Sequence, residues 1–186
     1  MRAWQGAAWS ACVLLVLGSA LGAQNLPGRR SPDQPQQPQG PAYLSGTWNF
    51  TWIGRESPLT PGPRSGSVTF TTAPDGRTIT SRTAGKVEDT GAAYTEEGTL
   101  AWDEGTNRLT FKERLAGTDV QGSGDWSSPL AIVYESSPVT VGGESLRLRR
   151  TYSILSARSF SVAEEISVNG GPYQRLGSGQ FVKSGS

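Results

Sequence analysis

Apolar and polar residues alternate along most of the chain after Leu44. In segment 46–52, GTWNFTW, the aromatic residues share one face of an extended strand, and two threonines and an asparagine share the other. Because successive strand residues point to opposite faces, this period of two predicts a strand with one buried face. The same period predicts further strands over residues 67–71, 77–83, 93–102, 108–115, 130–135, 145–155, 158–168 and 173–183.

Short segments of turn-forming residues separate these predicted strands. They are PDG at 74–76, DEGTN at 103–107, VGG at 141–143 and NGG at 169–171. Connections of this length join neighbouring antiparallel strands. We therefore predict an all-β fold, an antiparallel up-and-down β-barrel of about 8–10 strands, with a β-sandwich as the alternative.

Two segments depart from simple alternation. Residues 110–117 include side chains that a helical turn accepts, but the apolar residues of 109–115 lie two or four positions apart, which favours a strand. Residues 120–129 are rich in glycine and serine, and we predict a mobile loop there. That loop carries Trp126, which we expect to fold over a mouth of the barrel.

The residues before the predicted barrel are typical of an export signal followed by a linker. In residues 1–23, Arg2 precedes an apolar run at 12–18 and then small residues, which is typical of a signal peptide. The run is too short to span a membrane, and Cys12 does not follow it, where a lipoprotein anchor would need a cysteine. We expect export to the periplasm or the exterior, without membrane insertion after cleavage. Proline- and glutamine-rich residues 24–42 predict a disordered linker, and residues 43–186 the barrel domain.

Composition excludes several kinds of chemistry. The 186 residues contain no histidine and one cysteine. Ser-His-Asp and Cys-His nucleophilic sites, Cys/His zinc sites and histidine-ligated haem are therefore excluded. The formal net charge of +1 gives little electrostatic attraction to nucleic acid or to an anionic membrane. We predict no metal, no cofactor and no nucleic-acid partner, and the oligomeric state stays open.

Several segments resemble one family of barrels. LSGTW at 44–48 resembles the Gly-x-Trp opening of lipocalin-like (calycin) barrels, whose tryptophan closes one end of the barrel. The C-terminal half is similar to bacterial exported lipocalin-like domains of unknown function, through RTY at 150–152, SFSVAEEIS at 159–167, NGG at 169–171 and FVK at 181–183. The resemblance covers most of residues 44–183. Haem-binding nitrobindin-type barrels of this kind use a histidine ligand, so the resemblance implies no haem here.

The alternation places five charged residues among apolar ones on the inner face of the predicted strands. They are Glu96, Glu113, Arg150, Glu164 and Arg175. A lone buried charge costs several kcal/mol, so such residues must pair with one another or meet water. Either they form an internal network, or they line a polar pocket whose charges meet a ligand. A register slip or bulge would instead turn some of them outward.

Three functions are consistent with this pattern. The leading hypothesis is an exported barrel that binds a small, partly polar molecule, with Arg150 and Arg175 meeting an anionic or carbonyl group. Its candidate ligand-binding residues are Glu96, Glu113, Arg150, Glu164, Arg175 and Trp126. The second is a barrel enzyme of the isomerase, cyclase or hydrolase type, with Glu113 or Glu164 as general acid or base. The third is a structural or interaction domain.

Overall fold

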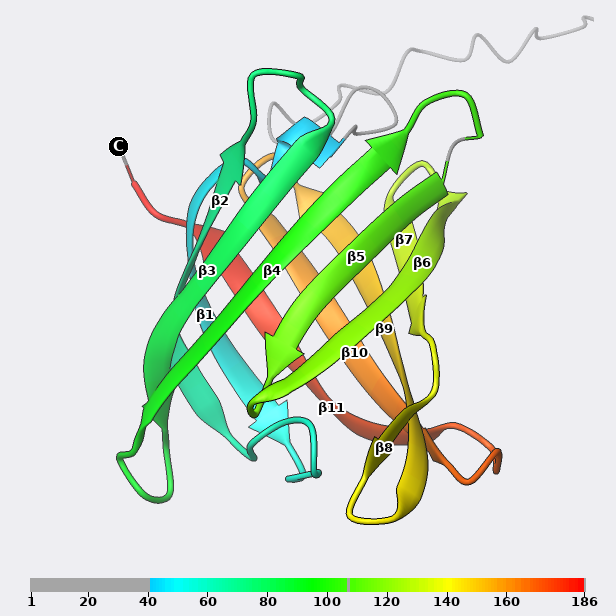
Figure 1. Cartoon of the computed structure of the whole chain (residues 1–186). Helices are drawn as coiled ribbons and strands as arrows, with labels where there is room; N and C mark the ends of the chain where they lie inside the picture. Colours follow the sequence, from blue (N-terminus) through cyan, green and yellow to red (C-terminus); the bar gives the residue numbers. More distant parts are fainter. Residues whose placement is uncertain (1–40, 107, 186) are drawn as a thin grey trace, which may run out of the picture. The chain divides into compact units, whose positions relative to one another are not determined.

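The computed structural model describes residues 41–106 and 108–185, so the predicted signal peptide and most of the predicted linker lie outside the described residues. The described chain forms a 3-10 helix and eleven strands (Figure 1). These elements are η1 (Pro41–Leu44), β1 (Gly46–Gly54), β2 (Arg64–Thr72), β3 (Thr78–Val87), β4 (Ala93–Asp103), β5 (Arg108–Leu115), β6 (Thr118–Ser128), β7 (Ala131–Ser136), β8 (Val139–Val141), β9 (Glu144–Ser156), β10 (Ser159–Val168) and β11 (Gln174–Lys183). In this part of the chain, no helix is long and apolar enough to cross a membrane.

The strands form one antiparallel sheet that closes on itself. β1 to β7 pair in chain order, β9 pairs with both β7 and β10, and β11 connects β10 to β1 (Figure 1). Ten strands thus complete a ring, and the short β8 adds to β9. Closure pairs both edges of each of these ten strands, so the ring leaves no long exposed edge. The predicted all-β, up-and-down barrel is confirmed.

The prediction of a mobile loop at residues 120–129 is wrong, because Thr118–Ser128 form strand β6. Its inward positions include Gly122 and Gly124, where the strand approaches β7 closely. A Cβ atom at Gly122 would lie 2.1 Å from the carbonyl oxygen of Glu135, and one at Gly124 would lie 2.3 Å from that of Val133. Glycine is needed here because two backbones meet, so its frequency does not indicate a loop. The strand predicted over residues 108–115 is confirmed as β5.

Apolar side chains fill most of the barrel in two clusters. One surrounds the fully buried Trp48. Its Nε1 donates a hydrogen bond to the carbonyl oxygen of Leu44 at 2.7 Å, and its ring packs edge-on against that of Phe160, with 4.8 Å between the ring centres. The other includes Leu109 and the fully buried Leu59, which comes from the connection between β1 and β2. Because these clusters occupy most of the interior, only small cavities remain for polar groups.

Replacing Gly124 by alanine should destabilise the barrel, because the new methyl group would also lie 2.6 Å from the ring of Tyr134. We expect a loss of about 1–3 kcal/mol in the free energy of unfolding, measured by urea denaturation. Gly62→Ala is the matched control, since its Cβ would meet nothing nearer than 3.8 Å and its φ lies outside the left-handed region. Equal losses in the two variants would contradict the close approach of β6 and β7.

Candidate functional site

Four of the five charged residues predicted to face inward meet inside the barrel. Arg150 on β9 donates a hydrogen bond from Nη1 to Oε2 of Glu113 on β5 at 2.7 Å. Its Nη2 lies 3.5 Å from Oε1 of Glu164 on β10 and 4.0 Å from Oε1 of Glu96 on β4. Arg150 and Glu164 are direct cross-strand partners, so their side chains share a face. One guanidinium thus joins carboxylates from three other strands.

Arg64 is a fifth member of this cluster and was not among the predicted site residues. It is buried at the start of β2, and its Nη2 lies 3.7 Å from Oε2 of Glu164. Its Nη1 donates to the carbonyl oxygens of Pro61 and Gly62, at 2.9 and 3.3 Å, in the connection between β1 and β2. The predicted strand began at residue 67, three positions too late. Extending the alternation backwards from Val68 would have placed Arg64 on the inner face.

Arg175 lies on the outer face, contrary to its prediction. The register between β10 and β11 shifts after Glu164: Glu164 pairs with Gly177, but Glu165 pairs with Arg175. The extra residue, Leu176, is buried, and Arg175 is exposed. A bulge of one residue reverses the direction of the side chains beyond it, which explains the error.

Trp126 also differs from its prediction. It lies on β6, opposite Ile132 of β7, and packs partly buried against the Leu109 cluster. It is part of the barrel wall, not of a loop across the mouth, and it does not line the cavity beside Arg150.

A cavity of about 80 Å³ lies beside the charged cluster. All five charged residues of the cluster line it, together with an aromatic wall of Phe50, Trp52, Phe70, Tyr94, Tyr152 and Phe181. A second cavity of about 30 Å³ also borders Glu113 and Arg150. Since one water molecule needs about 10–15 Å³ of such space, the larger cavity accommodates about five to eight non-hydrogen atoms.

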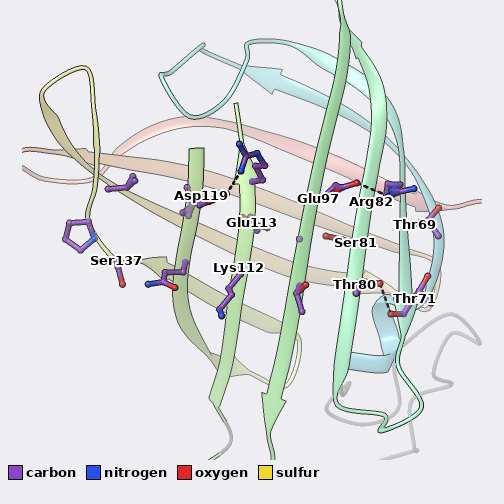
Figure 2. A pocket seen from close by; sticks show the side chains of 17 residues that line it. Thr69, Thr71, Thr80, Ser81, Arg82, Glu97, Lys112, Glu113, Asp119 and Ser137 are labelled. Atoms are coloured by element: carbon purple, nitrogen blue, oxygen red, sulfur yellow. Dashed lines mark hydrogen bonds and ion pairs between the residues drawn. The ribbon is translucent and has the colours of Figure 1, made fainter. Parts of the chain in front are cut away.

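A groove of about 1170 Å³, larger than either interior cavity, lies across the outer face of β2 to β6 (Figure 2). Its side chains are mostly exposed hydroxyls and surface charges. Arg82 pairs with Glu97 and Arg114 with Asp119, both at 3.0 Å. Exposed pairs of this kind contribute about 0–1 kcal/mol. Because the groove is open to solvent and these charges are already paired, the interior offers the stronger recognition chemistry.

Several polar atoms of the interior lack hydrogen-bond partners. Glu164 is fully buried, and neither of its oxygens accepts a hydrogen bond from any residue in the described ranges. Within the same ranges, Oε1 of Glu96, the hydroxyl of Tyr94 and Nε1 of Trp52 are also unpartnered. A buried polar atom without a partner costs about 1–3 kcal/mol. The cluster therefore has unused capacity to bind a proton or a molecule.

Burial governs the protonation of the cluster. Burial raises the pKa of Glu164 and of Glu113, and nearby Arg150 offsets this only in part. For Arg150 itself, burial acts to lower the pKa, but the three carboxylates together outweigh it and raise that pKa well above its usual value. Among the residues described, no three Asp, Glu, His or Cys side chains are grouped to hold a metal ion.

The closed ring of ten antiparallel strands has the fold of a lipocalin-like β-barrel. The chain is similar to the crystal structure of Rv2717c from M. tuberculosis, with a TM-score of 0.61 and 16% identity, over 77% of this chain and 94% of that one. It is also similar to a redesigned β-barrel, mFAP1, solved with bound DFHBI, with a TM-score of 0.42 and 15% identity, over 76% and 95% of the two chains. No protein-family model and no curated protein matches the sequence. The similarity to Rv2717c supports the barrel fold.

Replacing Arg150 by methionine should lower the free energy of unfolding by about 3–5 kcal/mol, because three buried carboxylates would lose their shared cation. Arg175→Met makes the same chemical change on the exposed face, and we expect it to alter stability by about 0.5 kcal/mol or less. Urea denaturation of both variants measures the difference. Similar losses at the two positions would contradict the assignment of Arg150 to the interior and Arg175 to solvent.

Glu164 should also make stability depend on pH. The pKa of Glu164 is raised in the folded state, so its protonation stabilises the fold. This contribution to the free energy of unfolding is complete below the unfolded-state pKa of 4.5 and is lost as the pH rises through the folded-state pKa. Glu164→Gln, which cannot ionise, should therefore have a higher Tm than the wild type at about pH 7, with the difference shrinking in acid. Glu165→Gln, on the outer face of the same strand, should follow the wild-type profile. Superimposable Tm profiles for Glu164→Gln and the wild type would contradict this role.

Proposed function

We propose that this protein binds a small, polar molecule inside its barrel, against the charged cluster. The observation that carries the proposal is Glu164, a fully buried carboxylate whose two oxygens have no hydrogen-bond partner in the described ranges and which lines a cavity of about 80 Å³. A ligand that donates hydrogen bonds to these oxygens would remove the cost of leaving them without hydrogen bonds. Apolar walls with a few convergent polar groups are typical of small-molecule sites.

The residues of the cluster would have different roles. Glu164 and Glu96 would accept hydrogen bonds from the ligand, because both oxygens of Glu164 and Oε1 of Glu96 accept none from the described residues. Arg150 already faces three carboxylates and would hold them in place. This revises the sequence-based hypothesis, in which arginines met an anionic or carbonyl group of the ligand. Arg175 and Trp126 have no part in the proposed site, since neither lines the cavity.

A barrel enzyme is the second candidate, and one observation favours it. Glu113 and Glu164 line the same cavity, and burial raises the pKa of both. A carboxyl group that keeps its proton closer to neutral pH is suited to general acid catalysis. Binding must precede any such step, so a binding test comes first under either candidate.

The proposal includes export. The apolar run in residues 1–23 supports a signal peptide. A ligand would then be met in the periplasm or outside the cell.

Native mass spectrometry of the protein purified from its own host tests the proposal. We expect a bound mass that disappears on denaturation. Thr83→Phe should abolish this mass, because Thr83 is buried and lines the cavity, so that the larger side chain would fill it. Thr80→Phe is the matched control on the exposed face of the same strand and should retain the bound mass. A wild-type spectrum without bound mass, or equal bound mass in both variants, would count against binding in this cavity.

A further inference from the structure

We infer that the molecule held in this cavity is a small organic cation, a protonated amine or a guanidinium group, that donates hydrogen bonds to Glu164 and Glu96. The inference rests on the proposed function and narrows it to one class of ligand. It follows from the charge of the cluster, from the unpartnered atoms and from the wall of the cavity.

The first argument is the balance of charge. Three carboxylates, Glu96, Glu113 and Glu164, face two guanidinium groups, Arg64 and Arg150. The guanidinium groups are also engaged already: Nη1 of Arg150 binds Glu113, and Nη1 of Arg64 binds two backbone carbonyls. With every group ionised, the interior therefore carries one negative charge in excess, which a cation would neutralise.

The second argument is the type of atom left unpartnered. In the described ranges, three carboxylate oxygens lack hydrogen bonds, two on Glu164 and one on Glu96. An ionised carboxylate can only accept hydrogen bonds, so its partner must be a donor. An ammonium group donates three hydrogen bonds, and a guanidinium group donates up to five. A neutral alcohol would supply one donor. An anion would add further acceptors and place a like charge beside buried carboxylates, which is unfavourable.

The third argument is the aromatic wall. Faces of aromatic rings attract cations that approach within about 6 Å of the ring centre. Arg64 already binds in this way, with its guanidinium carbon 4.4 Å from the ring centre of Trp52 and 5.1 Å from that of Tyr94. Phe50, Tyr152 and Phe181 add further ring surface to the same cavity. An amine with a short apolar chain therefore matches both the carboxylates and the wall.

Binding of such a cation should release a proton. Burial raises the pKa of Glu164 and Glu113, so the free cluster can neutralise its excess charge by holding a proton, and the cation would replace that proton. The affinity should therefore rise with pH. The titratable and charged groups that line the cavity with Glu164 are Arg64 from β2, Tyr94, Glu96 and Glu97 from β4, Glu113 from β5, and Arg150 and Tyr152 from β9. Glu97 is exposed and already paired with Arg82, so it leaves the charge balance of the interior unchanged.

Calorimetric titration of the full chain with three probes of similar size tests the charge class. The probes are n-butylammonium, 1-butanol and butanoate, at about pH 7 and in two buffers that differ in ionisation enthalpy. We expect n-butylammonium to bind about tenfold or more tightly than 1-butanol, butanoate not to bind, and up to about one proton to be released per bound cation. Equal or tighter binding of 1-butanol or butanoate, or no binding of n-butylammonium, would overturn the inference.

Matched variants locate the site. Glu164→Gln should weaken binding of n-butylammonium about tenfold or more and reduce proton release, because it removes the excess charge. Glu165→Gln, on the outer face of the same strand, should bind as the wild type does. Unchanged affinity in Glu164→Gln would refute the assignment. The proposed function is judged separately from the ligand class. A bound mass in the host-purified protein with no preference for the cation would support the binding site and reject only the ligand class, whereas no bound mass would count against the binding site itself.

Discussion

The ion pairs of Arg150 are the interaction on which the interior depends. One guanidinium on β9 faces carboxylates from β4, β5 and β10, all within the low-dielectric inside of a closed barrel. Without this cation, like charges would face one another where water screens them least. Arg64 extends the same network to the connection between β1 and β2, whose Leu59 enters the core. The electrostatics of the cavity and the packing of the connection between β1 and β2 are therefore linked through Arg64.

Alternation predicted the strands well wherever their inner positions carry large apolar side chains, as in β1 and β5. It failed at β6, where inward-facing Gly122 and Gly124 are required by a neighbouring backbone and give no hydrophobic pattern. The start of β2 was missed for a related reason, because Gly66 and Arg64 occupy its first inner positions. A strand shows a hydrophobic period of two only where its inner positions are apolar, so strands whose inner positions are glycine or charged residues do not show it.

The members of the cluster were largely predictable, but their pairing was not. Glu96, Glu113, Arg150 and Glu164 follow from the phase of their own strands. Their proximity depends on how the barrel closes, in particular on the pairing of β9 with both β7 and β10. Arg175 was assigned wrongly because the bulge after Glu164 leaves no mark in the hydrophobic pattern. Local sequence thus predicts which way the side chains of one strand point, whereas the register between strands depends on the whole sheet.

The form of the cluster favours the proposed binding pocket over a purely structural network. Buried ion pairs are rarely needed for stability, since apolar residues of similar volume often serve a fold as well or better. A network kept only for structure would be expected to balance its charges and to pair its oxygens. Here three carboxylates face two arginines, and both oxygens of the fully buried Glu164 lie in ion pairs of 3.5 and 3.7 Å yet accept no hydrogen bond among the described residues. A barrel that retains such a mismatch beside a cavity has an interior better suited to a ligand than to the fold alone.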